Sequence, residues 1–232
     1  MYESSQRKYK ERAQSNPSQK RTKPSHLDGV TIMTTKEYKK KHMTKIIGIT
    51  GKAGSGKDTA ADFIKEVHIK SQVTSFAKVL KEAASIITGL DPFYFDSRNP
   101  AREEVHPKIG KSPRQILKLL GTECARDILD ENVWVNHVKD EYLSAKTSYQ
   151  NIEYFVITDV RFNNEAEWII ENGGSIIQIE RNVPNDRRTD SRHATESGIL
   201  NSYINHRVLN YGTLEEFNLN TLRIIDLIKA ED

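Results

Sequence analysis

The stretch from Lys45 to Thr59, KIIGITGKAGSGKDT, decides the fold. It opens with a short apolar run rich in β-branched residues, which is typical of a strand buried on both faces of a parallel sheet. A glycine-rich segment follows, and from Lys57 to about Lys70 the apolar residues recur at helical spacing. The sequence therefore predicts strand, glycine loop and helix in that order, which a phosphate-binding loop requires.

The glycine loop carries the residue types that hold an anion. Gly51, Gly54 and Gly56 allow backbone conformations closed to other residues, so successive N–H groups can turn inward. The N-terminus of the helix adds partial positive charge, and Lys57 can reach terminal phosphates. An ordinary glycine turn between a strand and a helix is the alternative interpretation.

Asp58 departs from the usual loop pattern. It replaces the Ser or Thr that normally follows the lysine and ligates magnesium, and Thr59 comes after it. A carboxylate beside a triphosphate is repelled unless a cation lies between them, so we expect Asp58 to act through Mg²⁺ or its waters. The alternative is that Asp58 only stabilises the helix N-terminus electrostatically.

A second buried-strand run, Tyr154 to Thr158, ends in Asp159-Val160-Arg161. Residues two apart in an extended segment point to the same side, so Asp159 and Arg161 should project together. Parallel sheets bind ligands at the carboxyl ends of their strands, where the glycine loop also lies. We therefore expect the two motifs to converge, with Asp159 near magnesium or the acceptor and Arg161 on phosphoryl oxygens. The alternative is an ion pair between Arg161 and Glu165.

Ser112-Pro113-Arg114-Gln115 predicts a helix start, with the helix continuing to about Leu129. Its expected core face comprises Ile116, Leu117, Leu120, Cys124 and Ile128, so Cys124 should be buried. Arg114, Lys118 and Thr122 recur every four residues and form a stripe, either functional or simply solvated. Gly121 costs about 1 kcal/mol in a helix, which suggests close approach by a ligand or another backbone. Trp134 suits a core position better than a base-stacking platform.

Three further segments complete the expected domain. Ser75 to Thr88 predicts a helix entered from a short strand, and residues 91–111 predict an irregular insertion. The charged run from Glu180 to Ser197 suggests a flap whose arginines Arg187, Arg188 and Arg192 close on phosphates, with an exposed loop as the alternative.

Charge is distributed unevenly over the 232 residues. Residues 1–43 carry 11 Lys+Arg against 4 Asp+Glu and few large apolar residues, so we expect a disordered extension before a domain at 44–232. A solvated extension is favoured over a weak nucleic-acid contact through Lys39, Lys40 and Lys41. With one cysteine, no apolar membrane span and no secretory signal, we expect a cytoplasmic protein.

Several segments, in order, resemble the bacteriophage deoxynucleoside monophosphate kinases. They are GKAGSGKDTAADFI, SFAKVLKEA, SPRQILKLLGTE with Trp134 downstream, VITDVRFNNEAE and RHATESGI. This resemblance implies a three-layer α/β/α P-loop kinase fold with a mostly parallel sheet. It also implies transfer of the ATP γ-phosphoryl group to a deoxynucleoside 5′-monophosphate, with Mg²⁺ as cofactor, in the host cytoplasm if the gene is viral.

The family pattern assigns roles to residues of this sequence. Lys57, Asp58, Asp159 and Arg161 would be catalytic, and Asp58, Thr59 and Asp159 would face the metal. ATP would contact Gly51, Gly54, Ser55, Gly56, Lys57, Asp58, Thr59, Arg187 and Arg188. The monophosphate acceptor would contact Ser75, Lys81, Arg114, Lys118, Gly121, Thr122, Trp134, Asp159, Arg161 and Glu165.

Two rival functions stay open at this point. Another small-molecule P-loop kinase, acting on dephospho-CoA or phosphomevalonate, could share the glycine loop. A nucleotide-dependent motor or switch that grips nucleic acid is disfavoured, because Val160 rather than Glu follows Asp159 and no N-K-x-D motif occurs. Base preference, rejection of ribose and assembly as a homodimer are not determined by the sequence.

Overall fold

The computed structural model describes residues 26–27, 30–31, 44–147, 151–181 and 198–231. Contacts divide the chain into two units, Met1–His42 and Met43–Asp232. In the first unit, β1 (His26–Leu27) pairs antiparallel with β2 (Val30–Thr31). These four residues therefore depart from the disordered extension expected for residues 1–43. The overlooked signal is the Asp-Gly pair between them in the sequence, a dipeptide that favours hairpins.

The second unit is built on a five-stranded sheet in the order β4-β5-β3-β6-β7, and every neighbouring pair is parallel. Its strands are β3 (Lys45–Thr50), β4 (Ser71–Thr74), β5 (Tyr154–Ile157), β6 (Ser175–Glu180) and β7 (His206–Leu209). β3, the strand before the glycine loop, is central, with five of its six residues buried. A strand enclosed on both faces needs apolar side chains throughout, as the run KIIGIT supplies.

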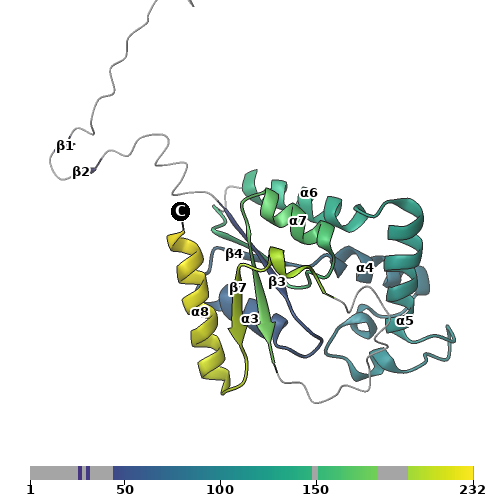
Figure 1. The fold of residues 1–232 in the computed structure, drawn as a ribbon. Helices are drawn as coiled ribbons and strands as arrows, with labels where there is room; N and C mark the ends of the chain where they lie inside the picture. The colour runs from purple at the N-terminus through teal and green to yellow at the C-terminus, as the bar shows by residue number, and fades with distance from the viewer. Residues whose placement is uncertain (1–25, 28–29, 32–43, 148–150, 182–197, 232) are drawn as a thin grey trace, which may run out of the picture. The chain divides into compact units, whose positions relative to one another are not determined.

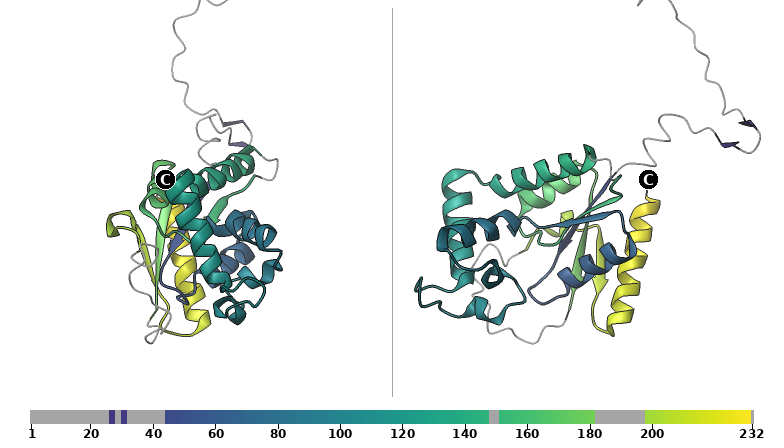
Figure 2. Two further views of the ribbon diagram at one scale, coloured as in Figure 1. Left: turned by 90° about the vertical axis from the view of Figure 1, so that its right-hand side faces the viewer. Right: turned by 180° about the vertical axis from the view of Figure 1, so that it is seen from behind.

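Helices cover both faces of the sheet, so the three-layer α/β/α prediction is confirmed (Figure 1). On one face, α3 (Lys57–Val67) and α8 (Leu214–Ala230) pack against Ile47 and Ile49. The other face packs around Ile46 and carries α4 (Ala77–Thr88), α5 (Pro113–Lys118), α6 (Val133–Thr147) and α7 (Asn163–Glu171). The two further views in Figure 2 show the same layers. Adjacent β3 residues thus serve opposite cores, because side chains alternate along a strand.

The helix expected from Ser112 begins as predicted, with a complete capping box between Ser112 and Gln115. From Leu119 to Leu129, however, it continues as a π-helix, η3. Its wider turn moves the core face to Gly121 and Ala125, which are four residues apart. The expectation that Cys124 and Ile128 are buried is therefore wrong: Cys124 is exposed and Ile128 is 75% exposed.

The segment 91–111 is irregular, as expected, and contains two short 3-10 helices, η1 (Pro92–Phe95) and η2 (Pro100–Glu103). Another 3-10 helix, η4 (Asn201–Tyr203), precedes β7. The expected flap arginines Arg187, Arg188 and Arg192 lie outside the described residues. Within the ranges that the structure describes, no helix combines the length and apolarity needed to cross a membrane.

Candidate active site

The glycine loop between β3 and α3 has the backbone that its sequence predicts. Gly51, Gly54 and Gly56 have φ angles of 145°, 73° and 106°, which side-chain-bearing residues rarely adopt. At Gly51 a Cβ atom would also lie 2.5 Å from the carbonyl oxygen of Ile179. The loop therefore needs glycine both for its left-handed turns and for close packing against β6.

Lys57, the first residue of α3, folds back over this loop. Its Nζ donates hydrogen bonds of 2.8 Å to the carbonyl oxygens of Gly51 and Lys52. Burial and the nearby charge of Arg161 lower the pKa of Lys57 to about 8, although Asp58 and Asp159 oppose this shift. The ammonium group thus lies over the loop and within electrostatic reach of the β5 end.

The two motifs converge as the sequence predicts. β5 lies beside β3 and parallel to it, so both strands end at the same edge of the sheet. Just beyond β5, the Val160 N–H donates to the Ile49 carbonyl over 3.1 Å, and Thr50 Oγ1 donates to the Val160 carbonyl over 2.8 Å. These bonds fix the segment that carries Asp159 and Arg161 against the start of the glycine loop.

Asp159 connects this edge to α4. Its two carboxylate oxygens accept hydrogen bonds from the backbone N–H groups of Phe76 (2.7 Å) and Ala77 (3.0 Å). Asp159 therefore acts as an acidic cap at the N-terminus of α4, where a negative charge is favourable. This contact also holds Ser75, the preceding residue, at the carboxyl edge of the sheet.

Glu165 holds the backbone around Arg161. One carboxylate oxygen, Oε2, accepts hydrogen bonds from the N–H groups of Arg161 (2.7 Å) and Phe162 (3.0 Å). The bonds reach the main chain, so they differ from the side-chain ion pair considered as an alternative. Burial, and secondarily the charge of Asp159, raise the pKa of Glu165 to about 8.

Arg126 completes this support. Its guanidinium carbon lies 3.7 Å from the centre of the Phe162 ring, and its NH1 lies 4.0 Å from Glu165 Oε1. Arg126 NH2 also donates to Asn164 Oδ1 over 3.1 Å. The turn bearing Arg161 is therefore enclosed by η3 and α7 together.

A group of cations gathers beside this turn. Burial and the charges of Arg161 and Arg114 lower the pKa of Arg102, a half-buried residue of η2. The buried Nε of Arg102 has no hydrogen-bond partner among the described residues, whereas Arg114 pairs with Glu103 at 3.2 Å. Clustered positive charge with an unused buried donor suits an anionic ligand.

Comparison with known proteins identifies the family. The family model for deoxynucleotide monophosphate kinase matches residues 88–220. A putative deoxynucleotide monophosphate kinase of Acanthamoeba polyphaga mimivirus is 31% identical over 193 residues, covering 78% of this chain and 96% of that protein. The chain belongs to the deoxynucleotide monophosphate kinase family. The family resemblance stated from the sequence is thereby confirmed, and the protein is a phosphotransferase.

Two further similar proteins can be compared with this kinase. The deoxynucleoside-5′-monophosphate kinase of Escherichia phage T5 is 27% identical over 248 residues, covering 80% of this chain and 97% of that protein. Among solved structures, a dephospho-CoA kinase from Campylobacter jejuni is 17% identical with a TM-score of 0.46, covering 82% of this chain and all of that one.

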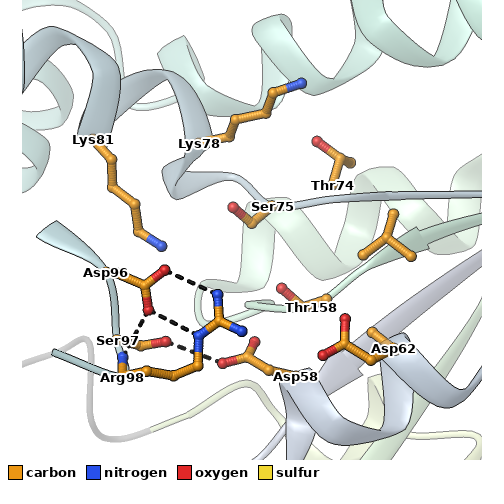
Figure 3. A pocket seen from close by; sticks show the side chains of 12 residues that line it. Asp58, Asp62, Thr74, Ser75, Lys78, Lys81, Asp96, Ser97, Arg98 and Thr158 are labelled. Carbon is orange, nitrogen blue, oxygen red and sulfur yellow. Dashed lines mark hydrogen bonds and ion pairs between the residues drawn. The ribbon is translucent and has the colours of Figure 1, made fainter. Parts of the chain in front are cut away.

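A cavity of about 260 Å³ opens beside the first turns of α3 in this kinase (Figure 3). Expected residues Ser75 and Lys81 line it, and Asp58 reaches it from α3. On the opposite wall, Ser97 Oγ donates to Asp58 over 3.1 Å, and Arg98 makes a two-point ion pair with Asp96. Figure 3 shows these side chains converging from α3, α4 and the insertion, so the cavity lies between the first turn of α3 and the insertion.

The remaining acceptor candidates of this kinase differ in exposure. Lys118 and Thr122 are half-buried, whereas Gly121 and Trp134 lie in the interior. Trp134 Nε1 donates to the Gly121 carbonyl over 2.9 Å. The close neighbour expected at Gly121 is a side chain rather than a ligand or backbone, since a Cβ there would lie 2.5 Å from Leu80 Cδ2.

Sequence reasoning missed several charged residues around the kinase site. Among them are Lys78, Asp96, Arg98 and Arg102. The last three fall in the insertion, where no regular spacing predicts which side chains face inward. The only signal was the density of charge in that insertion.

The residues present suit a magnesium ion. Asp58 and Thr59 lie exposed on the first turn of α3 and offer two oxygen ligands. Within the described ranges, no group of three or more His, Cys, Asp or Glu side chains could hold a metal by itself. Mg²⁺ commonly keeps several waters and binds through one or two protein groups plus substrate phosphates, so this sparse donor set fits.

Proposed function

We propose that this kinase transfers the γ-phosphoryl group of ATP to deoxynucleoside 5′-monophosphates, with the ATP phosphates in the glycine loop and the acceptor phosphate at the arginine cluster. By arginine cluster we mean Arg102, Arg114 and Arg161. The observation that carries the proposal is the convergence of the Lys57 loop and the Arg161 segment at one sheet edge, where hydrogen bonds of Val160 with Ile49 and Thr50 join them. Two anionic substrates require such clustered positive charge.

The donor side is formed by backbone as well as side chains. N–H groups of the glycine loop and the N-terminus of α3 would hold the β- and γ-phosphates, and Lys57 would exchange its loop carbonyls for phosphate oxygens. We propose that Asp58 and Thr59 hold Mg²⁺, directly or through its waters. When bound, the ion would supply charge neutralisation on the β- and γ-phosphoryl oxygens.

The acceptor side positions a phosphate for in-line attack. Arg161 approaches from the β5 end, and Arg102 and Arg114 approach from η2 and α5. Asp159 would act mainly by anchoring α4 to this edge, while keeping spare lone pairs for a metal-bound water. We assign Glu165 to holding the Arg161 backbone, because both of its short hydrogen bonds go to main-chain N–H groups. Phosphoryl transfer depends mainly on such positioning and charge stabilisation.

A panel of acceptors tests the proposal. The purified chain is incubated with ATP and Mg²⁺ and with each common deoxynucleoside or ribonucleoside monophosphate, and ADP release is measured. We expect at least one deoxynucleoside monophosphate to stimulate ADP formation. Stimulation by none of them would refute the proposal, and dephospho-CoA and mevalonate 5-phosphate in the same panel test the rival kinases.

Arg102 provides a residue-level test of the acceptor site. Arg102→Ala should raise the KM for the monophosphate by about tenfold or more, because a charged hydrogen bond to phosphate contributes about 1.5–3 kcal/mol. The KM for ATP should change little. Arg223→Ala is the matched control, since Arg223 is exposed on α8 and bonds only to nearby Asn220 among the contacts described. Equal changes in both KM values would refute the assignment of Arg102 to the acceptor.

A further inference from the structure

Asn210, the residue after β7, contacts the glycine loop from the side of β3 opposite to β5. Its side-chain Nδ2 donates a 2.8 Å hydrogen bond to the carbonyl oxygen of Ser55. Its own backbone N–H donates to the Glu180 carbonyl over 2.8 Å, which fixes Asn210 at the end of β6 and β7. A residue 155 positions away in the sequence thus holds the middle of the loop.

The packing at this contact is tight. Gly56 has a φ angle of 106°, and a Cβ atom on it would lie 2.6 Å from Asn210 Nδ2 and 3.4 Å from the Phe217 ring. The Asn210 amide therefore occupies the space that a side chain at Gly56 would need. The contact depends on glycine at that position, independently of any ligand.

The hydrogen bond also determines where a backbone donor points. The peptide joining Ser55 to Gly56 is trans, because the described chain has no cis peptide bonds. In a planar trans peptide the C=O and N–H bonds point in opposite directions. Since the Ser55 carbonyl is directed to Asn210, the Gly56 N–H is directed away from Asn210, toward the opposite side of the loop.

We infer that Asn210 is a positioning residue for phosphoryl transfer, which keeps the Ser55–Gly56 peptide turned so that its N–H can bind a phosphate of ATP. This inference rests on the proposed function, in which the loop binds the ATP phosphates. In this role Asn210 acts on ATP through the loop backbone and not by direct contact. Its effect should therefore appear in ATP binding and not in binding of the monophosphate acceptor.

Substitution by aspartate tests the inference with little change in size. Asn210→Asp replaces the N–H donor with an oxygen that faces the Ser55 carbonyl, so the hydrogen bond is lost. Asn205 at the other end of β7 is the matched control. Its Oδ1 accepts a 2.8 Å hydrogen bond from the Ile176 N–H, and aspartate can accept the same bond.

The dissociation constants of ATP and of the monophosphate are measured by calorimetric titration for the wild-type chain and both variants, well below their melting temperatures. We expect Asn210→Asp to weaken ATP binding by about tenfold, the loss that corresponds to one hydrogen bond. Binding of the monophosphate should stay at the wild-type value. Asn205→Asp should bind both ligands as the wild type does.

Several outcomes would overturn the inference. A folded Asn210→Asp variant with the wild-type ATP affinity would refute it, as would equal weakening of both ligands. Asn210→Ala, which removes the bond without adding repulsion, is the second variant, and failure of both to fold would show that Asn210 only maintains the fold. If the folded wild-type chain binds no ATP, the proposed function itself has failed, which is a distinguishable result.

Discussion

The substitution Glu165→Gln tests the buried support beneath Arg161. Glu165 is 2% exposed, and its Oε2 accepts the N–H groups of Arg161 and Phe162. Burial and the charge of Asp159 raise its pKa from 4.5 to about 8. A glutamine side-chain oxygen can accept the same two N–H groups without titrating.

The sign of the effect follows from proton binding. Between pH 4.5 and 8 the folded chain retains a proton on Glu165 that the unfolded chain has released. The free energy of unfolding must therefore fall as pH rises through this window. The contribution is at most about 1.4 kcal/mol per pH unit and about 5 kcal/mol over the whole window.

Urea unfolding at pH 5, 6, 7 and 8 measures this contribution. Relative to Glu165→Gln, the wild-type chain should lose about 1 kcal/mol of unfolding free energy per pH unit between pH 6 and 8. The two chains should differ least at pH 5, where Glu165 is largely protonated in the folded state. Parallel pH profiles for wild type and variant would refute the reasoning.

Glu141 supplies the matched control. Burial acts to raise its pKa, but hydrogen bonds from Thr74, Lys78 and Gln72 outweigh burial, and the net shift is downward. A lowered pKa contributes stability that is lost only as pH falls below the ordinary range of glutamate. Glu141→Gln should therefore leave the slope between pH 6 and 8 unchanged.

Three other perturbations test the loop and the domain boundary. Lys57→Met should reduce the rate of phosphoryl transfer at least about a hundredfold, as loss of a transition-state donor does. The circular dichroism spectrum should stay that of the folded chain, and a wild-type turnover rate would contradict the role given to Lys57. Gly51→Ala should lower the free energy of unfolding in urea by about 1–3 kcal/mol. Gly173→Ala, whose Cβ would meet open space, should lower it less, and equal losses of unfolding free energy would contradict the packing argument. Deleting residues 1–42 should leave kcat and KM near those of the full chain, whereas a large loss of activity would place the extension within the kinase unit.

The sequence predicted helices and strands correctly where the deciding residues lie within one helix or strand. The strand, loop and helix from Lys45 to Val67 formed as expected, because glycine positions and apolar spacing are local properties. The helix from Ser112 was predicted correctly at its start, where the capping box is local. Its continuation was predicted wrongly, since a π-helix changes which residues face the core, and Cys124 became exposed.

The sequence by itself determined the chemistry of the glycine loop and the meeting of two strand ends, because parallel strands bring their carboxyl ends to one edge. Only the tertiary structure decided which side chains support that edge. Asn210 lies 155 residues from the carbonyl it holds, and Arg102 emerges from an irregular insertion. Such contacts depend on how separate elements pack against one another, and the spacing of apolar residues along the chain does not predict that packing.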